Sequence, residues 1–191
     1  MGKVIHGLDM FHIAKLTSDS RDAEPVYATP EPVPGAVNVS VNPQTESNTF
    51  YADNGAYAVL NSMGDIEVTI GVADLPLSLQ KEIFGHQEEN GVQFASINDN
   101  ISEIALGFRS KVSTGGYRYY WFLKGKPQLV PIEGQTDEAN ANPQTANLTI
   151  RFMPLEYNGR WKAQAEDGTE FTQGNKWFDQ VVYKGAVFAG V

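Results

Sequence analysis

The 191-residue sequence predicts a mostly β protein, a β-sandwich or open barrel with one flanking α-helix and one long extended loop. Several short segments alternate apolar and polar residues, which is typical of half-buried strands. Asn-Gly, Asp-Gly and Gly-Gly pairs, which favour tight turns, occur between them. Only residues 75–85 repeat apolar positions with helical spacing. We therefore expect a single domain spanning residues 1–191.

The amino-acid composition excludes several classes of function. Hydrophobic residues make up 41% of the chain and charged residues 19%, as in folded proteins with an apolar core. The net charge of −9 disfavours tight binding of nucleic acid, because affinity for phosphate needs clustered Lys and Arg. The absence of cysteine excludes disulfides and thiolate metal sites. No secretory signal or membrane-spanning run is evident, so we expect synthesis in the cytoplasm and no membrane partner.

The first third of the chain contains a proline-rich segment, a strand and a loop. Residues 17–36 are rich in proline and predict an extended arm. Residues 37–41 (VNVSV) alternate and predict a strand. The tetrapeptide NPQT follows, and its Pro43 cannot donate to a central ladder, so we expect the strand to end there. Residues 43–55 then form a loop that closes at the Asn54-Gly55 turn.

Further strands are expected at residues 56–61, 65–70, 102–110, 116–124 and 146–152. Alternation gives three of the predicted strands one apolar face each, and we expect those faces to point into the domain. The inward set comprises Val37, Val39, Val41, Ile66, Val68, Ile70, Leu148, Ile150 and Phe152.

The single predicted helix spans residues 75–85. Asp74 is placed to cap it, and Gly85 is a plausible stop. Leu75, Leu79 and Ile83 recur at i, i+4 and i+8 and form one apolar stripe. At roughly 15 Å such a helix is too short to persist alone, so it must pack on the sheet.

The sequence contains few candidates for catalytic or metal-binding residues. His6, His12 and His86 are scattered and lack the spacing of a metal site. No nucleophile elbow, dinucleotide fingerprint or phosphate loop occurs. We therefore expect no enzyme activity, no catalytic residues, no bound metal and no cofactor.

One strand face suggests an alternative function. Tyr117, Tyr119 and Trp121 lie at alternate positions, so they share a face that could stack against sugars. A monomeric β-sandwich carbohydrate-binding module would use such a face. Aromatic residues more often fill a core, and that interpretation is favoured here.

A repeated tetrapeptide favours a structural role over a catalytic one. NPQT occurs at residues 42–45 and again at 142–145, each time beside an alternating segment. Together with GLDMFHIAKL, YATPEPVPGAVNVSV, SNTFYADNGAY and EIFG, this pattern resembles the major tail proteins of long-tailed, non-contractile phages of Gram-positive bacteria. The resemblance is best over residues 7–91, and RYYWFLKGKPQL, NPQTANLTIRFMP and WFDQVV also fit it.

The resemblance implies a tail-tube fold and a structural virion protein. Six subunits would form a ring, the rings would stack into the tail tube, and the lumen would conduct DNA during ejection without binding it specifically. The implied partners are other copies of the chain and further tail proteins at the tube ends, and the implied location is the virion tail. The inner tube of a contractile tail and the tube ring of a secretion system share this architecture and remain open.

Two sets of site residues follow from the implied tube. The polar strand faces become candidates for the lumen, where an acidic lining would keep DNA mobile. These candidates are Asn38, Ser40, Asp65, Glu67, Thr69, Asn147, Thr149 and Arg151. The loop carries aromatic residues between polar neighbours, which is typical of an inter-subunit contact. The expected contact residues are Asn48, Thr49, Phe50, Tyr51, Asp53 and Asn54.

Overall fold

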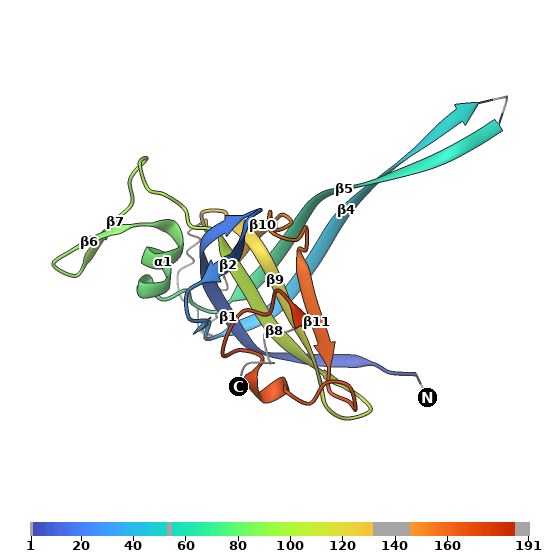
Figure 1. The fold of residues 1–191 in the computed structure, drawn as a ribbon. Helices are drawn as coiled ribbons and strands as arrows, with labels where there is room; N and C mark the ends of the chain where they lie inside the picture. Colours follow the sequence, from blue (N-terminus) through green and yellow to red (C-terminus); the bar gives the residue numbers. More distant parts are fainter. Residues whose placement is uncertain (1, 53–54, 132–145, 186–191) are drawn as a thin grey trace, which may run out of the picture.

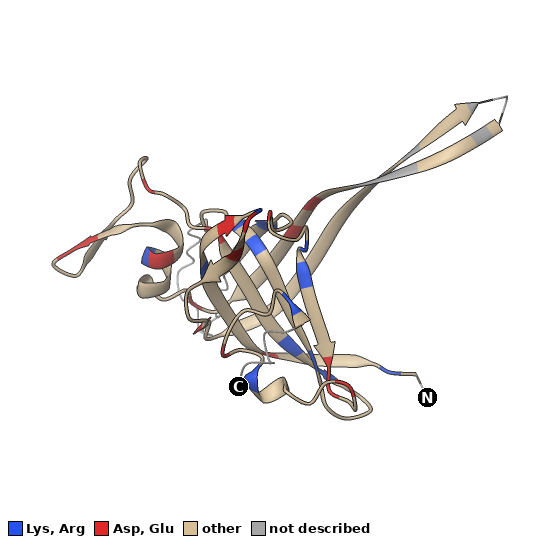
Figure 2. Ribbon diagram, viewed as in Figure 1, with Lys and Arg blue, Asp and Glu red and all other residues tan. Residues whose placement is uncertain are grey.

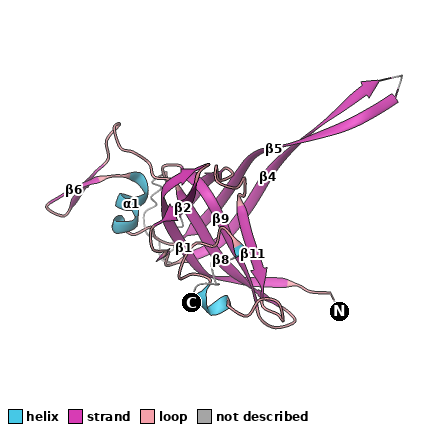
Figure 3. Cartoon of the chain, in the orientation of Figure 1, coloured by secondary structure: helices cyan, strands magenta, loops and turns pink. Residues whose placement is uncertain are grey.

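The computed structural model describes residues 2–52, 55–131 and 146–185 (Figure 1). Its strands are β1 (Ile5–Ser20), β2 (Ala23–Tyr27), β3 (Glu31–Pro32), β4 (Ala36–Ala52), β5 (Gly55–Val72), β6 (Gln87–Glu89), β7 (Val92–Phe94), β8 (Ile104–Val112), β9 (Tyr117–Pro127), β10 (Ala146–Phe152) and β11 (Lys162–Glu166). The helices are α1 (Leu77–Phe84) and a 3-10 turn, Gly174–Lys176. The mostly β prediction with one flanking α-helix is confirmed (Figure 3).

A nine-stranded antiparallel sheet dominates the described residues. Its order is β2-β1-β8-β9-β10-β5-β4, with β11 paired to β9 and β3 paired to β1. Side chains from β1, β8, β9, β10 and β5 meet in one interior cluster, so the sheet curls around its own core. β1 and β4 approach each other without pairing. One sheet therefore supplies all the walls of an open barrel.

The interior of the barrel is the first core, and α1 covers it. Leu75, Leu79, Ile83 and Phe84 are buried against the sheet residues. Gly85 ends the helix as predicted, with a φ of 74° and its N–H donating to the Lys81 carbonyl. The sheet residues of this core are Phe11, Ile13, Ile66, Val68, Ile70, Val72, Ile104, Leu106, Phe108, Phe122, Leu148, Ile150 and Phe152.

The start of the helix differs from the prediction. α1 begins at Leu77, after Pro76, and no side chain caps it. The expectation that Asp74 caps the helix is therefore wrong. Gln80 instead donates its side-chain N–H to the Leu75 carbonyl at 2.7 Å, which holds the incoming chain against the first turn.

The outer face of β1, β8 and β9 carries a second core. The chain after β10 packs there, and Trp121 donates its indole N–H to the Trp177 carbonyl at 3.0 Å. Trp121 is fully buried, and Tyr119 is 3% exposed. These central strands are therefore covered on both faces, which fixes the body of the protein around them.

Two irregularities bend β1. Its register with β8 shifts between His6 and Leu8 and again between Asp9 and His12. Gly7 and Met10 take positive φ angles of 63° and 55° at these points. Bulges of this kind bend a strand and increase its twist, so the 16-residue strand follows a curved wall.

The segment predicted as a loop is a hairpin. β4 continues through Pro43 to Ala52 and pairs with β5 along almost its whole length, so the predicted loop at 43–55 is wrong. Pro43 is tolerated because β4 is an edge strand, with β5 as its one partner in the described sheet. The predicted strands at 37–41, 56–61 and 65–70 all belong to this hairpin.

The proline-rich segment is more ordered than predicted. Residues 17–36 include the end of β1, all of β2 and β3, and the first residue of β4. β2 and β3 both pair with β1, so this stretch lies along the sheet edge rather than forming a free arm. The second NPQT copy, at 142–145, lies outside the described residues.

An ion cluster joins the end of β1 and the chain after β10 to β9. Lys124 donates to Asp19 at 2.9 Å and to Glu156 at 3.3 Å. The backbone N–H groups of Glu156 and Tyr157 also donate to the Asp19 carboxylate, at 2.8 and 3.3 Å. The Lys124 and Asp19 side chains are only 7% and 2% exposed. β1, β9 and the chain after β10 are thus held at one point.

The carboxylate of Asp19 is stabilised in its charged form. Burial alone would raise the pKa of Asp19, but the hydrogen bonds from Glu156, Lys124 and Tyr157 outweigh burial and lower the pKa. The Asp19 contribution to stability is therefore fully present above the unfolded pKa of about 4 and is lost as the pH falls through the folded pKa.

We expect Lys124→Met to lower the free energy of unfolding by about 3 kcal/mol at pH 7, because it leaves a buried carboxylate without its cation. Urea denaturation measures this loss. Lys126→Met, two positions along β9 and exposed, is the matched control and should change stability by no more than about 0.5 kcal/mol.

Measuring stability at acidic pH separates the contribution of the Asp19 charge from the contribution of its packing. The difference in unfolding free energy between the wild type and Asp19→Asn should narrow as the pH falls below about 4. A difference that stays constant from neutral to acidic pH would show that the charge of Asp19 does not stabilise the fold.

Candidate functional site: an exposed hairpin arm and a polar sheet face

The distal half of the β4–β5 hairpin extends away from the body of the protein (Figure 1). We call residues 44–52 and 55–63 the arm. The arm begins at a bulge, since Pro43 pairs with Ile66 but Thr45 pairs with Met63. The step is two residues on β4 and three on β5, and such a bulge bends and twists a hairpin. Nine residues of strand make the arm roughly 30 Å long.

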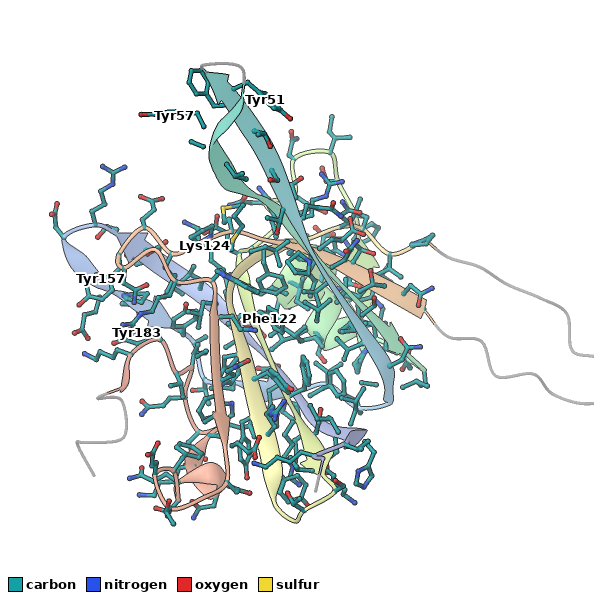
Figure 4. The ribbon with its side chains drawn as sticks, turned by 90° about the vertical axis from the view of Figure 1, so that its right-hand side faces the viewer. Tyr51, Tyr57, Phe122, Lys124, Tyr157 and Tyr183 are labelled. Carbon is teal, nitrogen blue, oxygen red and sulfur yellow. The ribbon has the colours of Figure 1, made fainter. Side chains whose placement is uncertain are left out.

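Large apolar side chains are exposed near the tip of the arm. Phe50, Tyr51 and Tyr57 are 57%, 70% and 73% exposed. Figure 4 shows Tyr51 and Tyr57 near the end of the arm. The rings of Phe50 and Tyr57 lie edge to face at 6.4 Å. Val59 and Met63 are exposed on the same arm. Exposed apolar groups gathered in this way mark interaction sites.

The structure places the expected contact residues on the arm. Asn48 pairs in register with Leu60, Thr49 with Val59, and Phe50 with Ala58. Asp53 and Asn54 lie outside the described residues. Phe50 and Tyr51 are thus presented by a strand pair rather than by a loop, and a contact role for these residues remains a proposal.

The expected lumen residues meet on one face of the sheet. In register across β4, β5 and β10, Thr69 lies between Ser40 and Thr149, and the neighbouring rows carry Asn38 with Asn147 and Glu67 with Arg151. Thr69 and Thr149 are within 3.3 Å through their hydroxyl oxygens. All eight predicted residues share this polar face: Asn38, Ser40, Asp65, Glu67, Thr69, Asn147, Thr149 and Arg151.

The polar face is close to neutral rather than acidic. Arg151 lies 3.9 Å from Asp65 and 4.0 Å from Glu67, measured between charged nitrogen and oxygen atoms. Lys126 of β9 pairs in register with Arg151 and adds a second cation. The described part of this face therefore carries two carboxylates and two cations. Figure 2 marks the acidic and basic residues along the strands.

Two of the nine residues expected to point inward are exposed. Val37 is 59% exposed because it is the extra residue of a bulge, where Ala36 pairs with Val72 and Asn38 with Gly71. Val41 is 38% exposed because β4 is the edge of an unclosed barrel. The inward direction holds for Val39, which packs against the first core. The remaining six lie on β5 and β10 and are buried as predicted: Ile66, Val68, Ile70, Leu148, Ile150 and Phe152.

The seam between β1 and β4 leaves an apolar groove of about 450 Å³. Ile5 and Leu8 of β1 form one wall, and Val39 and Val41 of β4 form the other. Phe122 lies at its base. This groove could not be predicted from the sequence, because it depends on two strand edges more than 30 residues apart approaching each other in the fold.

The face proposed for sugar binding is not accessible. Tyr119 and Trp121 are buried under the chain that follows β10, and Tyr119 is 5.6 Å from Trp177, measured between ring centroids. The carbohydrate-binding alternative through Tyr117, Tyr119 and Trp121 is therefore wrong, and the interpretation as core residues is confirmed.

A second hollow, of about 910 Å³, lies between α1, β1 and residues 100–103. Lys15, Lys81 and Lys126 line it together with Glu82 and Glu103. Across residues 2–52, 55–131 and 146–185, no group of three or more His, Asp or Glu side chains is arranged to hold a metal. Nor does any helix in those ranges have the length and apolar character needed to cross a membrane.

Comparison with solved structures identifies the fold. The chain is similar to the cap of the anti-feeding prophage, the AFP tube terminating cap, with a TM-score of 0.51 and 8% identity over 83% of this chain and 89% of that one. A second match, to the PVC sheath-tube complex of an extracellular contractile injection system in its extended state, has a TM-score of 0.49 and 9% identity over 83% and 89% of the two chains. No protein-family model and no curated sequence matches the chain. The fold is thus that of the tube-terminating cap.

We expect Phe50→Ala combined with Tyr51→Ala to leave the thermal unfolding midpoint of the unassembled protein within about 2 °C of the wild type, because the exposed rings contribute little to either core. Differential scanning calorimetry at low protein concentration measures this. Phe152→Ala, which empties part of the first core, is the contrasting variant and should lower the midpoint by roughly 10 °C or more. A comparable drop in the arm variant would show that the arm stabilises the fold.

Proposed function

We propose that this chain is a structural subunit of a phage-tail-like tube. Copies would form hexameric rings, the rings would stack, and the lumen would conduct DNA during ejection without binding it specifically. The observation that carries the proposal is the arm, a long hairpin with exposed aromatic rings that contributes to neither core. In an isolated protein such a hairpin exposes apolar surface and unpaired backbone to solvent, whereas in an assembly it is a contact.

The polar face suits a lumen. It spans three neighbouring strands, and its side chains are short amides and hydroxyls with a few charges of both signs. Arg151 has two carboxylates close by, so a phosphate group would have to compete with them for its guanidinium. We therefore assign Asn38, Ser40, Asp65, Glu67, Thr69, Asn147, Thr149 and Arg151 to the lumen.

The type of particle is a further part of the proposal. The sequence resembles non-contractile phage tail proteins, whereas the solved chain that it matches with a TM-score of 0.51 is the cap of the anti-feeding prophage. We propose a tail-tube subunit of a long-tailed phage of Gram-positive bacteria, located in the virion tail, with other tail proteins bound at the tube ends. A tube-terminating cap is the second candidate, because the match with a TM-score of 0.51 is such a cap.

Negative-stain electron microscopy of the purified protein, well above micromolar concentration, tests the proposal. Stacked rings with a central hole support a tube subunit. Single rings that do not stack favour the cap. Monomers under all conditions, including after addition of tube ends from a particle preparation, would contradict both functions.

We expect Phe50→Ala combined with Tyr51→Ala to abolish stacking, because a buried aromatic anchor is worth about 2 kcal/mol or more at a contact. The matched control is Phe50→Tyr combined with Tyr51→Phe, which keeps both rings and should still assemble. Assembly is measured by sedimentation and microscopy. Tubes of normal length from the alanine variant would show that the arm does not form the contact between stacked rings.

A further inference from the structure

The groove between β1 and β4 has the properties of a receptor site. Its walls expose Ile5, Leu8 and Val41, which are 42%, 37% and 38% exposed, and aromatic side chains lie at its base. A hollow of about 450 Å³ is within the range that binds a few large side chains. No described segment of the chain fills it.

Strand edges border the groove on both sides. Across the described sheet, β4 has a partner on one side only, and residues 5–9 of β1 pair with β8 alone. Backbone N–H and C=O groups on the far side of each strand are therefore available to an incoming strand. A strand that reaches the seam would meet a free edge beside it and an apolar surface beneath it.

The arm has the matching surface. It ends in Phe50, Tyr51 and Tyr57, whose rings are more than half exposed. Residues 36–64 contain two acidic residues and no Lys or Arg, whereas Lys162 lines the groove and no Asp or Glu is among its lining residues. The arm and the groove are thus complementary in charge as well as in apolar character.

The two surfaces lie at different places along the same strand. Tyr51 follows Val41 by ten residues on β4, a span of roughly 34 Å. The arm of one copy therefore cannot fold back into its own groove without breaking the β4–β5 pairing. It can reach the groove of a second copy displaced along the direction of the arm. Such a contact joins two different surfaces and repeats without closing, which is the geometry of a stack.

We propose that the groove between β1 and β4 receives the tip of the arm from the next copy of this chain. The rings of Phe50, Tyr51 and Tyr57 lie between the walls formed by Leu8 and Val41. This contact also covers the unpaired edge of β4. The inference rests on the proposed tube function and specifies which surface the arm binds.

Cysteine cross-linking tests the pairing, since the chain has no cysteine of its own. A tagged Tyr51→Cys variant is mixed with untagged Leu8→Cys or Val41→Cys protein, assembled, and mildly oxidised. We expect a disulfide-linked heterodimer in the assembled fraction, at least about tenfold above its amount in unassembled protein. Ile97→Cys, fully exposed outside the groove, is the control partner and should give no enrichment.

The outcomes separate this inference from the proposed function. Tubes in which Tyr51→Cys links to neither groove variant would overturn the groove as receptor and leave the tube function standing. Failure of the wild type to form any ring or tube would overturn both. As a second measurement, Leu8→Asp should raise the concentration needed for stacking by about tenfold or more without changing the unfolding midpoint of the monomer. Unchanged stacking in that variant would count against the groove.

Discussion

The free edge of β4 is the constraint on which the rest of the structure depends. The sheet curls far enough to build a core but stops before β4 reaches a pairing position on β1. A long edge strand normally invites uncontrolled pairing with other chains. Here the free edge continues into the arm. The strand that is open to unwanted pairing therefore also carries Phe50 and Tyr51, which would determine the partner that binds.

A directed contact of this kind requires a rigid body behind the arm. The central strands are covered on both faces, by α1 and the barrel interior on one side and by the chain after β10 on the other. The Asp19–Lys124 cluster ties that outer layer to β1 and β9. The bulge at Pro43 and Thr45 then sets the direction in which the arm leaves this body.

The sequence patterns correctly predicted features that depend only on neighbouring residues, such as the direction of side chains along a strand and the end of a helix. Alternation placed Ile66, Val68 and Ile70 in the core, because side chains of a strand point to opposite faces whatever the topology. The same holds for Gly85, whose positive φ serves the helix end. Pro43 misled the prediction because a proline is excluded only from a central strand, and whether β4 is central or at an edge depends on the order of the whole sheet. The groove between β1 and β4 could not be predicted either, because it too depends on how distant strands are arranged in the sheet.

The polar face shows how non-local pairing changes the chemistry of a surface. Taken along β5 alone, Asp65 and Glu67 suggested an acidic lining that repels DNA. The fold brings Arg151 within 4.0 Å of Glu67 and Lys126 next to Arg151, so the carboxylates are matched by cations. In the proposed lumen, DNA would then remain mobile for a different reason than repulsion. A phosphate that approaches Arg151 must compete with a carboxylate already beside it, and exposed pairs of this kind exchange partners at little cost in free energy.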